Sequence, residues 1–183
     1  NRSLPSLVGV TVHEMAHSWF QAVVATNEAL YEWMDEGFTS WIESECMKII
    51  SPREMSQERV GGSHSYSYYG YIKQALSGNE EAMSTHADHY TTNRAYGVAA
   101  YSKGEVLVEQ LGAIIGEKMR NEGMKEYFKV WSFKHPGPTD FKRVMERTSG
   151  IELDWYFDYF VNTTHTIDYA ISSVETNKKA STI

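Results

Sequence analysis

Two histidines and a glutamate occupy a spacing that suits metal chemistry. His13, Glu14 and His17 form the pattern H-E-x-x-H. On an α-helix, residues four apart lie about 40° apart around the axis, so both imidazoles reach one point above the same face. Neutral imidazole is a preferred zinc ligand, and the adjacent glutamate is placed to hold and deprotonate a metal-bound water. The alternative is a chance match with two core histidines, which occurs in roughly one chain of this length in a hundred.

A third ligand distinguishes the classes of protein that use this pattern. Metzincins carry glycine three positions and histidine six positions after the second histidine, where this chain has Phe20 and Val23. The other solution is an acidic ligand from a following helix. Glu36 lies 19 positions after His17, within the segment WMDEGF. Glu36 is therefore the candidate third ligand.

Three separately spaced segments resemble the aminopeptidase N family. The members of this family are zinc metallopeptidases of the gluzincin group, and the family also includes leukotriene-A hydrolases. VHEMAHSWF at 12–20 and the 18 residues between His17 and Glu36 match the family's zinc-binding pattern. YSKG at 101–104 is similar to the family's Tyr-Glu-Lys-Gly segment, and Tyr96 matches a tyrosine often found nearby. The chain departs from the pattern at Asp35, where the family commonly has asparagine.

The resemblance implies a site with one Zn²⁺ per chain. It implies that His13, His17 and Glu36 bind the metal and that Glu14 is the general base. It also implies that the Tyr101 hydroxyl stabilises the oxyanion during peptide cleavage; the alternative is a core tyrosine, because Tyr101 falls on the apolar stripe of its helix. Tyr96 is a candidate for the cleft.

Glu43 is a further candidate near the metal. It lies seven residues after Glu36, on the same helix face. One interpretation is a hydrogen-bond acceptor for a ligand histidine, and the equally weighted alternative is a surface acid.

The activity implied by the resemblance is zinc-dependent hydrolysis of peptide bonds, with removal of N-terminal amino acids from a peptide substrate. The family reads the substrate's free amine with a Gly-x-Met-Glu-Asn segment upstream of the zinc helix, and this sequence does not contain one. We therefore expect the isolated fragment to lack part of its substrate cleft. Two alternatives stay open: epoxide hydrolysis at the same zinc site, and a non-catalytic scaffold relative.

The elements that would position these residues are mainly helical. Apolar periodicity and breaking residues predict helices over 5–25, 34–50, a short stretch to 76, 95–115, 117–133, 139–148 (capped by Thr139 or Asp140) and a last one to 161. The first is apolar on most of its circumference, which is typical of a buried helix.

Two other segments carry residues with chemical potential. Residues 77–93 show no helical or strand periodicity, which predicts a long loop, and we expect this loop to line the cleft. The alternative is a second metal site formed by His86 and His89. The tyrosines of 66–71 indicate either a substrate wall or ordinary packing.

For domain organisation, we expect residues 1–165 to be the zinc-binding helical part of a thermolysin-like catalytic domain, truncated at its N-terminal side, with little or no sheet. Residues 166–183 would begin a following β segment or form a disordered tail, because Ile167, Tyr169 and Ile171 alternate.

Composition narrows the function classes. A hydrophobic content of 42% excludes a disordered chain, and a net charge of −7 without a basic block disfavours nucleic-acid binding. No apolar run approaches the ~18 residues of a membrane span. The single cysteine, Cys46, excludes an intrachain disulfide. Compartment and oligomeric state stay open.

Overall fold

The computed structural model describes residues 4–50, 62–166, 175–176 and 181–182, and within them helices dominate. The longer helices are α1 (Leu4–Ala16), α2 (Phe38–Ile50), α4 (Ser65–Ala75), α6 (Gly104–Ile115), α7 (Glu117–Trp131), α8 (Pro138–Ser149) and α9 (Asp154–Asn162). The shorter ones are η1 (Trp33–Gly37), η2 (Ala87–His89), α5 (Asn93–Gly97) and η3 (Val98–Lys103). Two short strands, β1 (Glu175–Thr176) and β2 (Ser181–Thr182), pair antiparallel. The prediction of a mainly helical fold with little sheet is confirmed.

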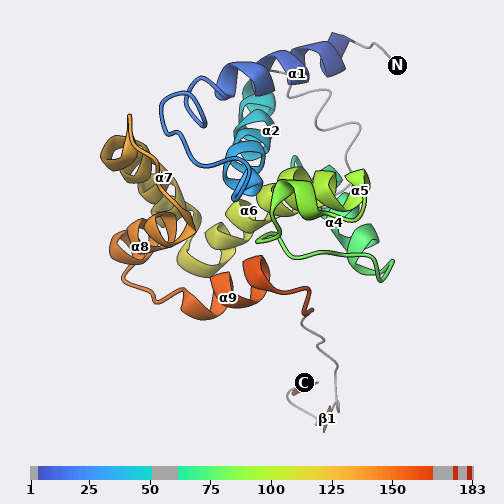
Figure 1. The fold of residues 1–183 in the computed structure, drawn as a ribbon. Coiled ribbons are helices and arrows are strands. Elements are labelled where there is room, and N and C mark those ends of the chain that lie inside the picture. The colour runs from blue at the N-terminus through green and yellow to red at the C-terminus, as the bar shows by residue number, and fades with distance from the viewer. Residues whose placement is uncertain (1–3, 51–61, 167–174, 177–180, 183) are drawn as a thin grey trace.

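The helices gather around α2 and α6, which pack against each other at the centre (Figure 1). α1 lies across one end of α2, α7 and α8 form a pair on one side, and α4 packs on η3 at the other. The core between them is rich in large aromatic and aliphatic side chains, including Trp33, Phe38, Leu107, Leu111, Tyr127 and Phe141. Burying each such side chain contributes about 1.5–3 kcal/mol, so this core fixes the helices that carry the candidate site.

The first helix is shorter than predicted. α1 ends at Ala16 rather than at residue 25. Gln21 has a φ of 114°, which no helix accommodates, and it turns the chain so that Phe20 and Val24 enter the core. The His17 N–H still donates to the His13 carbonyl at 3.3 Å. The helical spacing of the two histidines therefore survives the end of the helix.

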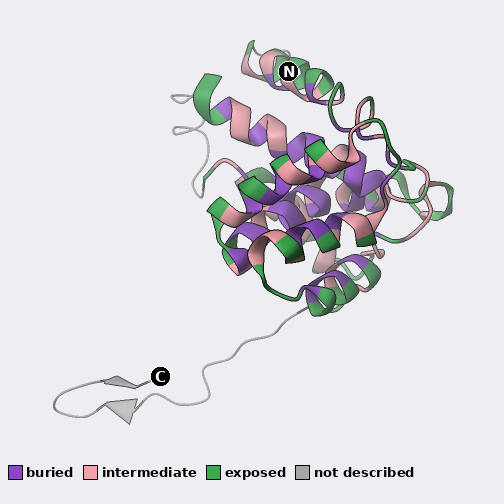
Figure 2. Ribbon diagram, turned by 90° about the vertical axis from the view of Figure 1, so that its left-hand side faces the viewer, coloured by how far each residue is buried: buried purple, intermediate pink, exposed green. Residues whose placement is uncertain are grey.

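The prediction that this first helix is buried is also wrong. In α1 only Gly9 and Ala16 are buried, whereas Leu4 is 72% exposed and Leu7 is 63% exposed. Figure 2 shows mainly exposed and half-buried residues along this helix, which carries the N label. The reason is that α1 packs against α2 on one side only, which leaves an apolar face open.

The second predicted helix and the one over 95–115 are present, and each contains a π-helical segment. η1 leads directly into α2, and α5, η3 and α6 form one continuous run. The two π segments pack together where Gly37 meets Gly104, and a Cβ atom on Gly104 would lie only 2.8 Å from the Gly37 Cα. These segments carry Glu36 and Tyr101.

The other predicted helices are present, and the start of one of them differs from the prediction. Residues 77–92 form a loop with one short helical turn, η2, as expected, and α7, α8 and α9 match their predicted ranges. The cap of α8 is Gly137, whose N–H donates to Asp140 Oδ2 at 3.0 Å. The helix begins with Pro138, and the Asp140 side chain in the first turn stabilises this start by accepting the Gly137 N–H. The alternation at 167–171 lies outside the described residues.

None of the described helices combines the length and the apolar character needed to cross a membrane.

Candidate metal centre

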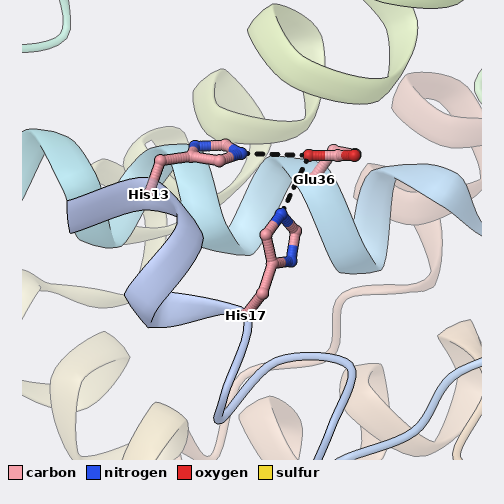
Figure 3. A group of neighbouring side chains, drawn as sticks. All are labelled: His13, His17 and Glu36. Carbon is pink, nitrogen blue, oxygen red and sulfur yellow. Dashed lines mark hydrogen bonds and ion pairs between the residues drawn. The ribbon is translucent and has the colours of Figure 1, made fainter. Parts of the chain in front are cut away.

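Three side chains predicted as metal ligands converge on one point. The Nε2 atoms of His13 and His17 lie 3.1 Å and 3.3 Å from the same oxygen, Oε2 of Glu36 (Figure 3). α1 and the turn after it supply the histidines, and η1 supplies the glutamate. Ligand atoms around a tetrahedral zinc ion with bonds of about 2.0–2.1 Å are about 3.3 Å apart. The donor types and their separations therefore fit zinc.

The opposite nitrogen of each imidazole faces a carboxylate. His13 Nδ1 lies 3.2 Å from Glu43 Oε2, and His17 Nδ1 lies 2.8 Å from Asp35 Oδ1. The Glu43 hydrogen bond favours the proton on His13 Nδ1 and so favours Nε2 as the metal-binding atom. At His17, Nδ1 is within hydrogen-bond distance of the Phe20 carbonyl and Thr39 Oγ1, both at 3.3 Å, and Asp35 adds a nearby negative charge. The structure thus places Glu43 against a predicted ligand. Sequence reasoning assigned no role to Asp35, although its departure from the family pattern was the available signal.

The electrostatics of the site favour a cation. Hydrogen bonds to Glu36 and Glu43 raise the pKa of His13 to about 9. Burial alone would raise the pKa of Glu36, but hydrogen bonds from His13 and Tyr101 hold it below its ordinary value. Burial raises the pKa of Asp35 to about 7, against the opposing charge of His17. A site that stabilises positive charge this strongly suits a divalent ion.

The predicted catalytic side chains lie beside these ligands. Tyr101 stacks on His13 with ring centroids 5.9 Å apart and is 37% exposed. Burial and the Glu36 carboxylate raise the pKa of Tyr101, which keeps its proton available for donation. Glu14 is exposed at the mouth of the adjoining cavity. Tyr96 packs edge-on against Tyr90, with ring centroids 5.6 Å apart, and lies outside the lining of that cavity.

A cavity of about 680 Å³ opens from the three ligands. It runs between α1, α2, α4 and η3 and is lined by His13, Glu14, His17, Glu36, Ser40, Glu43, Ser44, Met47, Tyr66, Ser67, Tyr101, Ser102 and Glu105, with Pro5, Ser6, Gly9 and Val10 at its α1 side. Tyr66 thus belongs to the wall of the site, whereas Tyr71 packs against Lys103. No residue of 77–93 lines this cavity, so the expectation that this loop lines the cleft is wrong. The loop is held elsewhere, for example by the Ala87 N–H bond to the Ala29 carbonyl at 2.9 Å.

His86 and His89 lie near each other, with ring centroids 4.9 Å apart. The His86 ring accepts the Asp88 N–H at 3.1 Å and so caps the η2 turn. Within the described part of the chain, neither histidine belongs to a group of three or more potential metal ligands.

A buried charge network that includes the cavity-lining Glu105 was not predicted from the sequence. His64 Nδ1 lies 2.7 Å from Glu105 Oε1, and His64 Nε2 lies 2.7 Å from Glu45 Oε1. Glu109, 3.4 Å from the same ring, is also paired with Arg120 at 2.6 Å. Burial opposes charge on His64, but the bonds to Glu105 and Glu45 raise its pKa to about 9. The network links α2, the start of α4 and α6 at the cavity wall, where Glu105 belongs to the lining, and its partners are too far apart in sequence to form a motif.

A helical fold that brings two histidines and a glutamate to one point beside a tyrosine defines the helical part of a zinc-metallopeptidase type of domain. Residues 2–160 match the Peptidase family M1 domain, and the chain belongs to this family.

Relatives and solved structures agree with this assignment. The chain is 25% identical over 142 residues to aminopeptidase N of Streptomyces lividans, covering 78% of this chain and 17% of the relative. It is 23% identical over 177 residues to leucine aminopeptidase 2 of Lodderomyces elongisporus, covering 85% of this chain and 26% of the relative. An M1 zinc metallopeptidase from Deinococcus radiodurans has the same fold, with a TM-score of 0.67, 17% identity, and coverage of 87% of this chain and 34% of that one. The chain therefore spans about a sixth to a third of the length of these proteins.

Proposed function

We propose that the protein containing this chain is a zinc-dependent aminopeptidase, which hydrolyses the first peptide bond of a peptide substrate. The observation that carries the proposal is the convergence of His13 Nε2 and His17 Nε2 on one oxygen of Glu36, beside Glu14 and Tyr101. Membership of the M1 family and the names of the relatives, aminopeptidases from several organisms, support the peptide-hydrolysing class.

His13, His17 and Glu36 would hold the zinc, which supplies a polarised carbonyl and a water of lowered pKa when bound. Glu14 would take the proton of the attacking water and pass it to the leaving amine. The Tyr101 hydroxyl would donate a hydrogen bond to the developing oxyanion, and its raised pKa keeps the proton in place for this purpose. Asp35 and Glu43 would hold both imidazoles in the orientation seen here.

The direct test removes the base and leaves the ligands intact. Glu14→Gln should lower kcat for an aminoacyl anilide by about 10²–10⁴-fold, because a general base contributes about that factor. Zinc content should stay near one per chain. Glu122→Gln, at an exposed position of α7, is the matched control and should keep full activity. Peptide cleavage at the unmutated rate by the Glu14 variant would refute the mechanism.

A parallel assay separates the proposed activity from its alternatives. Peptides with a free and with an acetylated N-terminus, and an epoxide substrate, would be compared at equal enzyme concentration. We expect cleavage only of the peptide with a free amine. Epoxide opening without peptide cleavage would reassign the reaction, and the absence of both activities in a zinc-loaded protein would favour a scaffold role.

A further inference from the structure

The solvent-facing side of α4 carries a line of mostly apolar side chains that begins at the cavity. Tyr66 is 74% exposed and Tyr69 is 63% exposed, and Ile72, Lys73 and Leu76 continue the exposed side. These positions follow the three- and four-residue steps that place side chains on one helix face. Tyr66 and Ser67 also line the cavity next to the predicted metal ligands. We call this stripe, residues 66, 69, 72, 73 and 76, the α4 face.

The α4 face is separate from the packing of the helix. The inward side of α4 is polar, because Ser67 donates to Glu105 at 2.5 Å and Gln74 donates to the Asn79 carbonyl at 2.7 Å. Gly70 brings the helix close to η3, since a Cβ there would lie 3.0 Å from the Ser102 Oγ. Ser102 lines the cavity as well. The α4 face therefore begins at the cavity wall with Tyr66 and continues along the helix outside the cavity.

The cavity and the α4 face differ in the charged side chains that they carry. The described residues that line the cavity include four glutamates and no lysine or arginine. The α4 face, in contrast, carries Lys73, whose Nζ lies 5.7 Å from the Tyr69 ring centroid. A negatively charged group is thus favoured about two turns beyond Tyr66, next to Lys73. An extended chain with a terminal carboxylate fits this arrangement.

We propose that the part of a peptide substrate downstream of the cleaved bond lies along the α4 face, with its C-terminal carboxylate near Lys73. This inference rests on the proposed peptidase function and specifies the length and the end group of the preferred substrate. Tyr66 and Lys73 are about 10.5 Å apart along the helix axis, at about 1.5 Å per residue. An extended peptide covers this distance with about three residues, at about 3.3 Å each. Peptides of about five or six residues therefore reach Lys73, whereas dipeptides end inside the cavity.

The test compares substrates that differ only at the far end. The zinc-loaded protein would be assayed with an aminoacyl anilide, with a hexapeptide carrying a free C-terminal carboxylate, and with the same hexapeptide as its amide. We expect Lys73→Glu to raise KM for the free acid by roughly two- to fivefold, the range that an exposed charge pair supports, with little change in kcat. The amide and the anilide should be unaffected. Lys125→Glu on α7 is the matched charge control and should change none of the three.

A second variant tests the apolar part of the α4 face. Tyr69→Ser combined with Ile72→Ser, two exposed positions outside the cavity lining, should raise KM for both hexapeptides and leave the anilide kinetics unchanged. If the anilide is cleaved but neither variant alters the hexapeptide KM, the α4 path is wrong and the proposed function stands. A change of oligomeric state without a change of KM would show that another protein surface covers this face, which also overturns the inference. If the wild-type protein cleaves neither anilide nor peptide, both proposals fail together.

Discussion

A carboxylate lies close to the Nδ1 atom of each predicted histidine ligand, and the two carboxylates come from different elements. Glu43 sits within α2 and contacts His13, whereas Asp35 sits in η1 beside the third predicted ligand and contacts His17. Asp35 is also the more deeply buried of the two, with a side chain 7% exposed against 33% for Glu43. A buried carboxylate interacts more strongly than an exposed one, so Asp35 should have the larger effect on its imidazole.

This contact predicts the result of a conservative substitution. Asp35→Asn keeps the size of the side chain and removes its charge, so we expect zinc affinity to fall by roughly tenfold, at the low end for residues that orient a metal ligand. Chelator competition at fixed pH measures the change. Asp158→Asn, at an exposed position of α9, is the control. An unchanged zinc affinity in the Asp35 variant would mean that the Phe20 carbonyl and Thr39, both 3.3 Å from the same nitrogen, are sufficient to orient His17.

At the scale of elements, the contact between η1 and η3 sets the distance between a predicted ligand and the predicted catalytic tyrosine. Glu36 immediately precedes Gly37, and Tyr101 lies three residues before Gly104. Because neither glycine has a Cβ, the two segments approach to backbone contact. Any side chain at either position would push Glu36 and Tyr101 apart.

Gly104→Ala adds only one methyl group, but it should lower both the folding stability and the activity of the protein. A Cβ 2.8 Å from the Gly37 Cα forces a backbone shift, and overpacking of this kind costs about 1–3 kcal/mol of folding free energy. We expect a lower unfolding midpoint and a loss of kcat larger than the loss of zinc affinity. Gly97→Ala is the matched control, because a Cβ at Gly97 meets nothing within 4 Å and its φ is an ordinary helical −61°. Equal behaviour of the two variants would contradict the role of the glycine contact.

At the scale of the whole molecule, buried charges connect segments that are distant in sequence. His64 joins α4 to α2 and α6 through Glu45 and Glu105. Lys103, the last residue of η3, also joins distant segments, since its Nζ donates to Glu80 at 2.6 Å and to the Thr163 carbonyl at 3.3 Å. These links hold the loop after α4 and the end of α9 against the segment that carries Tyr101.

The His64 network predicts a defined pH dependence of stability. The pKa of His64 is about 9 in the folded protein against an ordinary value of 6.5, so its contribution is complete below pH 6.5 and is lost as the pH rises through 9. We expect the free energy of unfolding, followed by urea denaturation, to fall between pH 6.5 and 9 by about 1–3 kcal/mol. His64→Gln should be less stable at pH 6 and should show a flatter profile over this range. A wild-type profile as flat as that of the variant would exclude a charged His64.

The parts of the molecule that sequence could predict are those encoded locally or by a recognisable spacing. The histidine pair lies within one helical turn, and Glu36 was identified by its distance from His17 and its similarity to a family pattern. The end of α1 was missed because Val23 and Val24 continue the apolar periodicity, although Val24 pairs instead with Lys134, which lies 110 residues further along the chain. His64 was missed for the same reason, since Glu105 lies 41 residues away. Long-range packing decided both cases and leaves no mark on local sequence.

The contact between Gly37 and Gly104 also bears on how much the site has to rearrange during a reaction. Where two segments meet through side chains, rotamer changes let them drift, and the charges they carry drift with them. Here main-chain atoms meet directly, so the separation of the two segments has little freedom once the helices have packed. The entropy lost in fixing Glu36 and Tyr101 relative to each other is then lost during folding and not again at each turnover. Two residues without side chains thus keep the reorganisation energy of this centre low.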